Sequence, residues 1–153
     1  MAEITTADIK ALRDETGLSI AEVRNALAEA EGDKTKAQEI LKNRSAEVAA
    51  KKGDRALGAG AINAYIHNGG ASGVLLELSC ETDFVAKNEE FKALARDIAM
   101  HVAAMNPADI AELMPQPFIK APDMTIQEMV NGAIQKFGER TEVRRFTRFS
   151  VSE

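Results

Sequence analysis

Hydrophobic residues in the first 42 positions recur at the three- and four-residue spacing of short amphipathic helices. Gly17 and Gly32 are expected to end the first two helices, because glycine adopts a positive φ at such ends without strain. Ser19 with Glu22, and then Asp33, should cap the second and third helices. The apolar stripes comprise Ile9 and Leu12; Ile20, Val23 and Leu27; and Ala37, Ile40 and Leu41. The pattern predicts a compact three-helix bundle with a small core.

Two strand-like runs follow, at residues 61–67 and 74–80, on either side of a glycine-rich segment at 68–73. Apolar and polar residues alternate in the second run, so successive side chains should point to opposite faces of a sheet. One face comprises Val74, Leu76, Leu78 and Cys80, and the other Leu75, Glu77 and Ser79. The pattern predicts a hairpin with one face packed on helices and the other partly open.

Two longer helices and a last strand complete the pattern. Asn88 is expected to cap the first helix and Gly138 to end the second, while prolines between residues 107 and 122 exclude a continuous helix across that stretch. Residues 141–151 alternate as a strand. The helical apolar residues are Phe91, Leu94, Ala95, Ile98, Ala99, Val102 and Met105, then Ile126, Met129, Val130, Ala133, Ile134 and Phe137. This strand-strand-helix-helix-strand order predicts an α+β core, in which helices cover a small, mainly antiparallel sheet.

The composition changes between the bundle and the hairpin. Residues 44–58 are rich in Ala, Lys, Arg and Glu, which is typical of a helical or partly ordered linker with a solvated basic face. The expected organisation is therefore a three-helix module at 1–43, a linker at 44–58 and an α+β core at 59–153.

Charge and composition narrow the function classes. The chain has 153 residues, with 19 Lys and Arg against 24 Asp and Glu, and this acidic balance argues against a general nucleic-acid binder. No apolar run approaches the roughly 20 residues that span a membrane, and the first residues do not resemble a signal peptide, which predicts a cytoplasmic location. The single cysteine excludes an intramolecular disulfide and, with two histidines, makes a metal site a weak interpretation. A protein partner is expected.

The residue types of a thiol hydrolase are present, in which a base activates a thiolate and a carboxylate orients the base. They are Cys80, His67, His101 and Asp83. However, Cys80 falls on the apolar face of a predicted strand, where a free cysteine behaves as a small buried hydrophobe. His101 sits between the apolar and polar sides of the long helix, as surface or boundary histidines do. We expect no enzyme active site in the chain.

Arginines near the carboxyl end can hold phosphate or form ion pairs; they are Arg140, Arg144, Arg145 and Arg148. On a regularly alternating strand, Arg144 and Arg148 lie on one face and Arg145 on the other, so they form no single patch. The pattern favours structural or salt-bridging roles.

Segment 81–88 joins the second predicted strand to the long helix and places a large aromatic residue, Phe84, in a turn. The residues alone leave two interpretations open. Phe84 can pack beneath the helix as a hydrophobic staple beside the Asn88 cap. Alternatively, Phe84 is exposed beside Asp83 and anchors a protein partner.

Short segments, in order along nearly the whole chain, resemble those of one known family. They are Leu12–Gly17, Ala26–Ala30, Ala49–Lys52, Thr82–Glu89, Ile98–Ala104, Gln116–Phe118 and Val143–Phe149. The segment Thr82–Glu89, preceded by Leu76–Glu81, is similar to the signature of the translation elongation factor Ts family, the nucleotide-exchange factors for elongation factor Tu. The resemblance is to a short, single-repeat member of that family.

The resemblance implies a ubiquitin-associated-like bundle that docks on elongation factor Tu, and a core that acts on the magnesium and phosphate region of that partner. The implied partner-binding residues are Leu18, Ser19, Ile20, Val23, Arg24 and His101, and those implied to dislocate the partner's Mg²⁺ are Thr82, Asp83, Phe84 and Val85. The implied function is guanine-nucleotide exchange: the chain binds the GDP and nucleotide-free forms and promotes GDP release so that GTP can bind. No cofactor is implied.

The chain departs from the family pattern in two places. Residues 106–115 replace a long helical insertion, and Ser19–Arg24 stands where the family often has two methionines followed by lysines. The alternative function is a protein-binding adaptor that does not exchange nucleotide. The open sheet face, which includes Leu75, further suggests a homodimer.

Overall fold

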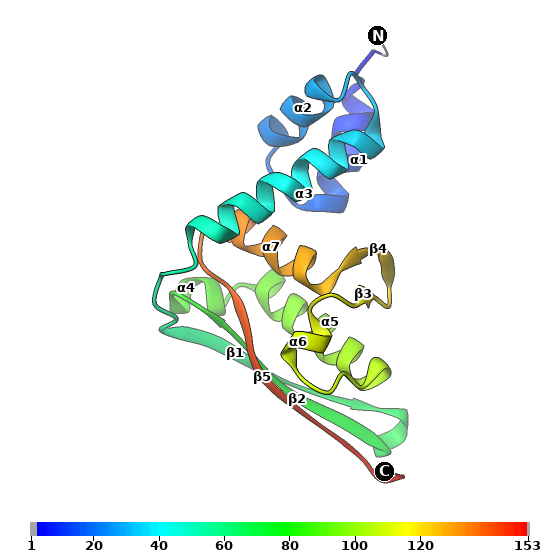
Figure 1. The fold of residues 1–153 in the computed structure, drawn as a ribbon, viewed down its shortest axis with the longest axis vertical. Coiled ribbons are helices and arrows are strands. Elements are labelled where there is room, and N and C mark those ends of the chain that lie inside the picture. The colour runs from blue at the N-terminus through cyan, green and yellow to red at the C-terminus, as the bar shows by residue number, and fades with distance from the viewer. Residues whose placement is uncertain (1–2, 153) are drawn as a thin grey trace.

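The computed structural model describes residues 3–152; Met1, Ala2 and Glu153, at the ends of the expected modules, lie outside it. Three helices form a bundle at one end of the molecule: α1 (Thr6–Thr16), α2 (Ile20–Glu29) and α3 (Lys34–Lys51) (Figure 1). The expected caps are confirmed except at the end of α2, where Ala30 rather than Gly32 is the C-terminal cap. Ser19 and Glu22 form a capping box, Asp33 accepts a hydrogen bond from the Lys36 amide, and Gly17 ends α1 with φ of 68°.

A small apolar cluster holds the bundle together. Its buried members are Leu12, Leu18, Val23, Ala26, Leu27, Ala30, Ala37 and Leu41. This confirms the three stripes with one correction, since Ile20 is 56% exposed. Ile20 is the first residue of α2 and lies on the side of the helix that faces solvent.

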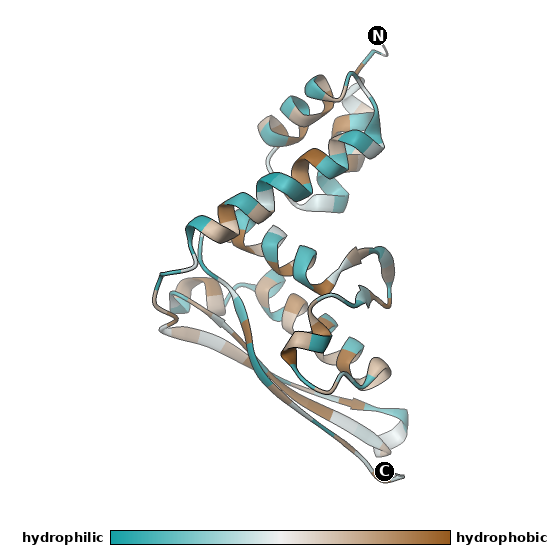
Figure 2. Ribbon diagram, in the orientation of Figure 1, coloured by the Kyte–Doolittle hydropathy of each residue, from teal (hydrophilic) through white to brown (hydrophobic). Residues whose placement is uncertain are grey.

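Helix α3 is longer than the bundle requires. It continues to Lys51, so the expected boundary between Asn43 and Arg44 falls inside a continuous helix. Val48 and Ala49, beyond that boundary, pack against the core rather than the bundle. Most of α3 is hydrophilic in Figure 2, as expected of a helix that contacts its neighbours along narrow stripes. Separate folding of the two modules stays a prediction.

The main sheet is antiparallel, with strand order β1-β2-β5. Its strands are β1 (Ala59–His67), β2 (Ser72–Cys80) and β5 (Glu142–Ser150). The expected hairpin is confirmed, and Asn68, Gly69 and Gly70 adopt positive φ in its turn, a short 3₁₀ helix η1 (Asn68–Gly70). The register of β2 and β5 shifts between Glu77 and Leu78, which leaves Arg144 as an extra residue in β5.

Helices cover one face of this sheet. They are α4 (Asp83–Ala86), α5 (Glu89–Met105), α6 (Ile110–Leu113) and α7 (Ile126–Phe137), with a two-stranded hairpin of β3 (Pro117–Phe118) and β4 (Ala121–Thr125) before α7. Figure 1 shows α5 against the sheet and α7 between α5 and α3. The long helices and the last strand are confirmed, whereas the β3-β4 hairpin lies where the prolines predicted only a connection. The α+β fold class is confirmed.

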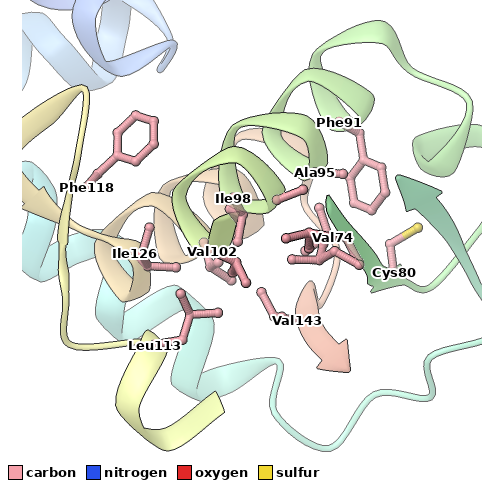
Figure 3. Packing of buried hydrophobic residues seen from close by; sticks show 14 of the residues in the cluster. Val74, Cys80, Phe91, Ala95, Ile98, Val102, Leu113, Phe118, Ile126 and Val143 are labelled. Atoms are coloured by element: carbon pink, nitrogen blue, oxygen red, sulfur yellow. The ribbon is translucent and has the colours of Figure 1, made fainter. Parts of the chain in front are cut away.

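The core lies between α5, the sheet and α7 (Figure 3). Its largest fully buried side chains include Phe91, Leu76, Leu78, Ile98, Leu113 and Ile126. Phe91 meets the ring of Phe137 edge-on, with ring centroids 6.1 Å apart. Helix α5 is thereby fixed, and with it the short helix α4 that precedes it.

Candidate protein-docking site

The short helix α4 presents Phe84 to solvent, where the side chain is 87% exposed. Thr82 caps this helix and accepts a hydrogen bond from the Val85 amide. Val85 and Ala86 are buried in the core. Because neighbouring residues on a helix point about 100° apart, burial of Val85 turns Phe84 outward. The interpretation of Phe84 as a staple under α5 is therefore wrong, and Val85 occupies that place.

Glu139, just after α7, holds the turn that leads into α4. Its Oε1 accepts hydrogen bonds from the backbone amides of Glu81 at 3.1 Å and Thr82 at 2.9 Å. Its Oε2 accepts from the Thr82 hydroxyl at 2.6 Å. In return, Oε2 of Glu81 accepts from the Arg140 amide at 2.6 Å. Phe84 thus projects from a turn whose backbone is tied to a distant part of the chain.

Charged groups surround a hollow of about 350 Å³ next to this turn. Asp83, Lys87 and Lys92 line it, together with Asn63 of β1. The Oδ1 atom of Asn63 is buried and has no hydrogen-bond partner among the described residues. The surface beside this turn therefore carries both signs of charge, and an unpaired acceptor lies buried next to it.

The expected contact residues of the bundle separate into two groups. Ser19, Ile20 and Arg24 are exposed at the start of α2. Leu18 and Val23 are buried in the bundle core. The first group can touch a partner directly, whereas the second can only support it.

His101 is fully buried, so its expected position at the surface or helix boundary is wrong. The Ile119 amide donates to Nδ1 at 3.2 Å, so Nε2 carries the hydrogen and donates to Gln116 Oε1 at 2.8 Å. These bonds tie α5 to the β3-β4 hairpin. The residue is enclosed because that hairpin, which the pattern did not reveal, covers it. His101 is not available for direct contact in this structure.

Cys80 is buried, and its thiol donates to the Thr82 carbonyl at 3.3 Å. Burial, followed by the charge of Glu139, raises the pKa of this thiol and disfavours the thiolate. His67 pairs with Ser72 at the far end of the hairpin from Cys80, and His101 is bonded to the β3-β4 hairpin. The residues of the thiol-hydrolase interpretation are therefore not brought together. Within residues 3–152, no cluster of His, Cys, Asp and Glu could hold a metal ion.

The carboxyl-terminal arginines bind other parts of this chain. Arg140 donates to the Arg55 carbonyl at 2.7 Å, Arg148 donates to the Ala103 carbonyl at 3.0 Å, and Arg145 lies 3.5 Å from a Glu77 oxygen. Arg144 lines the same outer hollow as Arg145. The expectation that Arg144 shares a face with Arg148 is wrong, because the bulge in β5 interrupts the alternation. These contacts agree with the structural role predicted for these arginines.

No element within residues 3–152 covers the outer face of the main sheet. Its exposed hydrophobic residues are Ile62, Ile66, Leu75, Phe149 and Val151. Part of this face forms an open hollow of about 440 Å³. No helix among residues 3–152 combines the length and apolar character needed to cross a membrane.

Comparison with known proteins gives consistent similarities. The family model described as "Elongation factor TS" matches residues 81–153. A protein named elongation factor Ts from Desulforamulus reducens is 39% identical over 198 aligned positions, covering 100% of this chain and 91% of the relative. Those from Heliobacterium modesticaldum and Carboxydothermus hydrogenoformans are 37% and 38% identical, covering 98% of this chain and 91% and 90% of the relatives. The alignments are longer than this chain, so the relatives carry residues without a counterpart here.

Proposed function

Because the chain belongs to the elongation factor Ts family, we propose that it is a guanine-nucleotide exchange factor for elongation factor Tu. It binds the GDP form of that GTPase, displaces Mg²⁺ and promotes GDP release so that GTP can bind. The activity takes place in the cytoplasm, and the chain contributes binding rather than covalent chemistry. It requires no cofactor, nucleic acid or membrane.

The exposed Phe84 side chain on a fixed turn is the observation that carries this proposal. Exposure of an aromatic side chain to water is unfavourable, and such side chains are typical anchors of protein interfaces. Asp83 is exposed beside Phe84 and adds a carboxylate. A wedge of this kind, with Thr82 and Val85 as its support, fits insertion next to a bound metal and nucleotide.

Thermodynamic linkage explains how binding alone releases GDP. A protein that binds the nucleotide-free GTPase more tightly than the GDP form must weaken GDP binding by the same factor. Mg²⁺ between protein and phosphate is a large local charge, so moving the groups around it weakens both metal and nucleotide. The exposed residues at the start of α2, namely Ser19, Ile20 and Arg24, would bind the partner independently of this effect.

The rate of GDP release tests the proposal. Elongation factor Tu loaded with a fluorescent GDP analogue should lose the analogue much faster when the chain is added, in proportion to chain concentration until saturation. Binding without faster release would contradict exchange and support the adaptor alternative.

A chain lacking residues 1–43 should remain folded in this assay but bind elongation factor Tu weakly. Ser45, Val48 and Ala49, which contact the core, are retained by this truncation, whereas α1, α2 and their exposed contact residues are lost. Circular dichroism and a binding titration would report folding and affinity. Undiminished affinity would contradict the docking role of the bundle, and loss of the folded core would contradict the proposed module boundary.

We further propose that two copies pair through the outer sheet face. That face carries five exposed hydrophobic residues and no covering element among the described residues. Analytical ultracentrifugation should give twice the chain mass at micromolar concentrations. Phe149→Glu should give a monomer, whereas Ile119→Glu, a matched change on another surface, should leave the dimer intact. Monomeric mass for the unaltered chain over a broad concentration range would contradict this proposal.

A further inference from the structure

The end of α7 and the residues just after it contact both surfaces that the proposed function uses. Glu139 holds the turn before Phe84, as described above. Four residues earlier, Gln135 bonds to the bundle. Its Oε1 accepts a hydrogen bond from the Ser45 hydroxyl of α3, and its Nε2 donates to Glu22 Oε1 of α2 at 2.7 Å.

Glu22 connects Gln135 to the exposed edge of α2. Its other oxygen, Oε2, accepts from the Ser19 amide at 3.0 Å and from the Ser19 hydroxyl at 2.8 Å. Burial opposes ionisation of Glu22, but bonds from Ser19 and Gln135 and the charge of Arg44 hold its pKa below the usual range. The carboxylate is therefore charged at neutral pH and accepts strongly from both neighbours. Ile20, the next residue after Ser19, lies on the surface.

Besides the bonds of Gln135, α3 contacts the core through the apolar side chains of Val48 and Ala49 and through the polar side chain of Lys42. Lys42 donates to the Asp123 carbonyl at 2.8 Å and lies 3.3 Å from a Glu128 oxygen. Next to them is a hollow of about 250 Å³ between the bundle and β4. These contacts all come from α3, so among the described residues α2 is joined to the core directly only through specific side-chain bonds such as that of Gln135 to Glu22. Gln135 supplies such a bond to each of two bundle helices.

We infer that residues Gln135–Glu139 form a shared anchor, which fixes the bundle edge through Gln135 and the Phe84 turn through Glu139, and so sets the spacing between the two contact surfaces. The inference rests on the proposed function for what these surfaces touch. Two contacts that are already correctly spaced bind a partner without the cost of ordering them. Neither anchor side chain needs to reach the partner, so both are positioning residues.

Two variants should separate the two halves of the anchor kinetically. Glu139→Ala releases the Phe84 turn, so GDP release at saturating chain should slow by about tenfold, in line with loss of hydrogen bonds to a charged group. The concentration of Glu139→Ala that gives half of its maximal rate of GDP release should change little. Gln135→Ala releases the bundle, so the half-saturating concentration should rise by about tenfold while the saturating rate is kept. Glu139→Gln keeps one acceptor oxygen and should fall between Glu139→Ala and the unaltered chain.

The free protein provides a second readout that does not depend on the partner. In Glu139→Ala, the Glu81 and Thr82 amides should exchange hydrogen much faster, while the amides of β2 stay protected. In Gln135→Ala, nitrogen relaxation should show increased motion of α2 relative to the core. Glu142→Ala is the matched control, because Glu142 is an exposed carboxylate whose Oε2 atom lies 3.4 Å from the Arg140 guanidinium. It should change none of these quantities.

Three results would overturn the shared anchor. These are unchanged protection of Glu81 and Thr82 in Glu139→Ala, unchanged motion of α2 in Gln135→Ala, or the same kinetic constant altered by both variants. If the unaltered chain failed to accelerate GDP release, the proposed function would be wrong. The exchange and relaxation measurements would still decide whether the anchor restrains both surfaces.

Discussion

Phe84→Ala is expected to leave the free energy of unfolding nearly unchanged while GDP release slows by about 30-fold or more. The Phe84 ring is 87% exposed, so its removal takes away little buried area. Truncating a central aromatic anchor of an interface typically costs about 2 kcal/mol or more, which corresponds to that factor. Stopped-flow release of a fluorescent GDP analogue and thermal melting of the free chain would measure the two effects.

Asp83→Asn is the control for this variant. It keeps the shape of the turn and removes the charge expected to act near the partner's magnesium. A slowing that depends on magnesium concentration in Asp83→Asn, but not in Phe84→Ala, would separate the electrostatic and steric contributions. A large fall in the melting temperature of Phe84→Ala, with normal exchange per folded molecule, would contradict the wedge.

Phe91→Ala, seven residues further along, should have the opposite effect. Phe91 is fully buried and packs edge-on against Phe137. Its truncation removes apolar burial and leaves a cavity, which should lower the free energy of unfolding by roughly 3–5 kcal/mol. For a chain of this size, the melting temperature should fall by on the order of 10 °C. Denaturant unfolding followed by circular dichroism would measure the change.

Exchange activity of Phe91→Ala should be normal per folded molecule at a temperature where the variant remains native. The pair therefore distinguishes an exposed contact residue from a core residue within one short segment. Slow exchange by fully folded Phe91→Ala would show that core packing under α5 controls the position of the Phe84 turn.

Local patterns predicted most of the elements because their signals lie within a few residues. Ser19 with Glu22, Asp33 and Asn88 cap the helices expected from their spacing, and Gly138 ends α7. Alternation in β2 correctly predicts the buried face and the exposure of Leu75 on the other, although Ser79 on that second face is buried. The exposed aromatic was recognised as one of two alternatives. A choice between them required knowing which side of α4 faces the core, and burial of Val85 decides this.

The parts that could not be predicted depend on contacts between distant residues. Glu139 reaches Thr82 across 57 positions, and Gln135 reaches Glu22 across 113. Neither Glu139 nor Gln135 belongs to a sequence motif or a periodic pattern that would predict these contacts. The burial of His101 could not be predicted for the same reason. Gln116 and the Ile119 amide bond to it from the β3-β4 region, and the prolines in that stretch gave no sign of a hairpin. The bulge in β5 arises from pairing with β2, which periodicity along one strand does not reveal.

Because α3 is one continuous helix, the rotation along it determines how the bundle is oriented relative to the core. Leu41 packs in the bundle, whereas Ser45, one turn later, bonds to α7. Each residue of an α-helix contributes about 100° of rotation and about 1.5 Å of rise. A single residue inserted or deleted between Leu41 and Ser45 would therefore rotate the bundle about the α3 axis by about 100° relative to the core. A change of about seven residues, or two helical turns, would restore this rotation but move the bundle further from the core or closer to it. Helix α3 is therefore a rigid connection, and the number of residues between Leu41 and Ser45 sets the orientation of the bundle. A flexible linker would not constrain its length in this way.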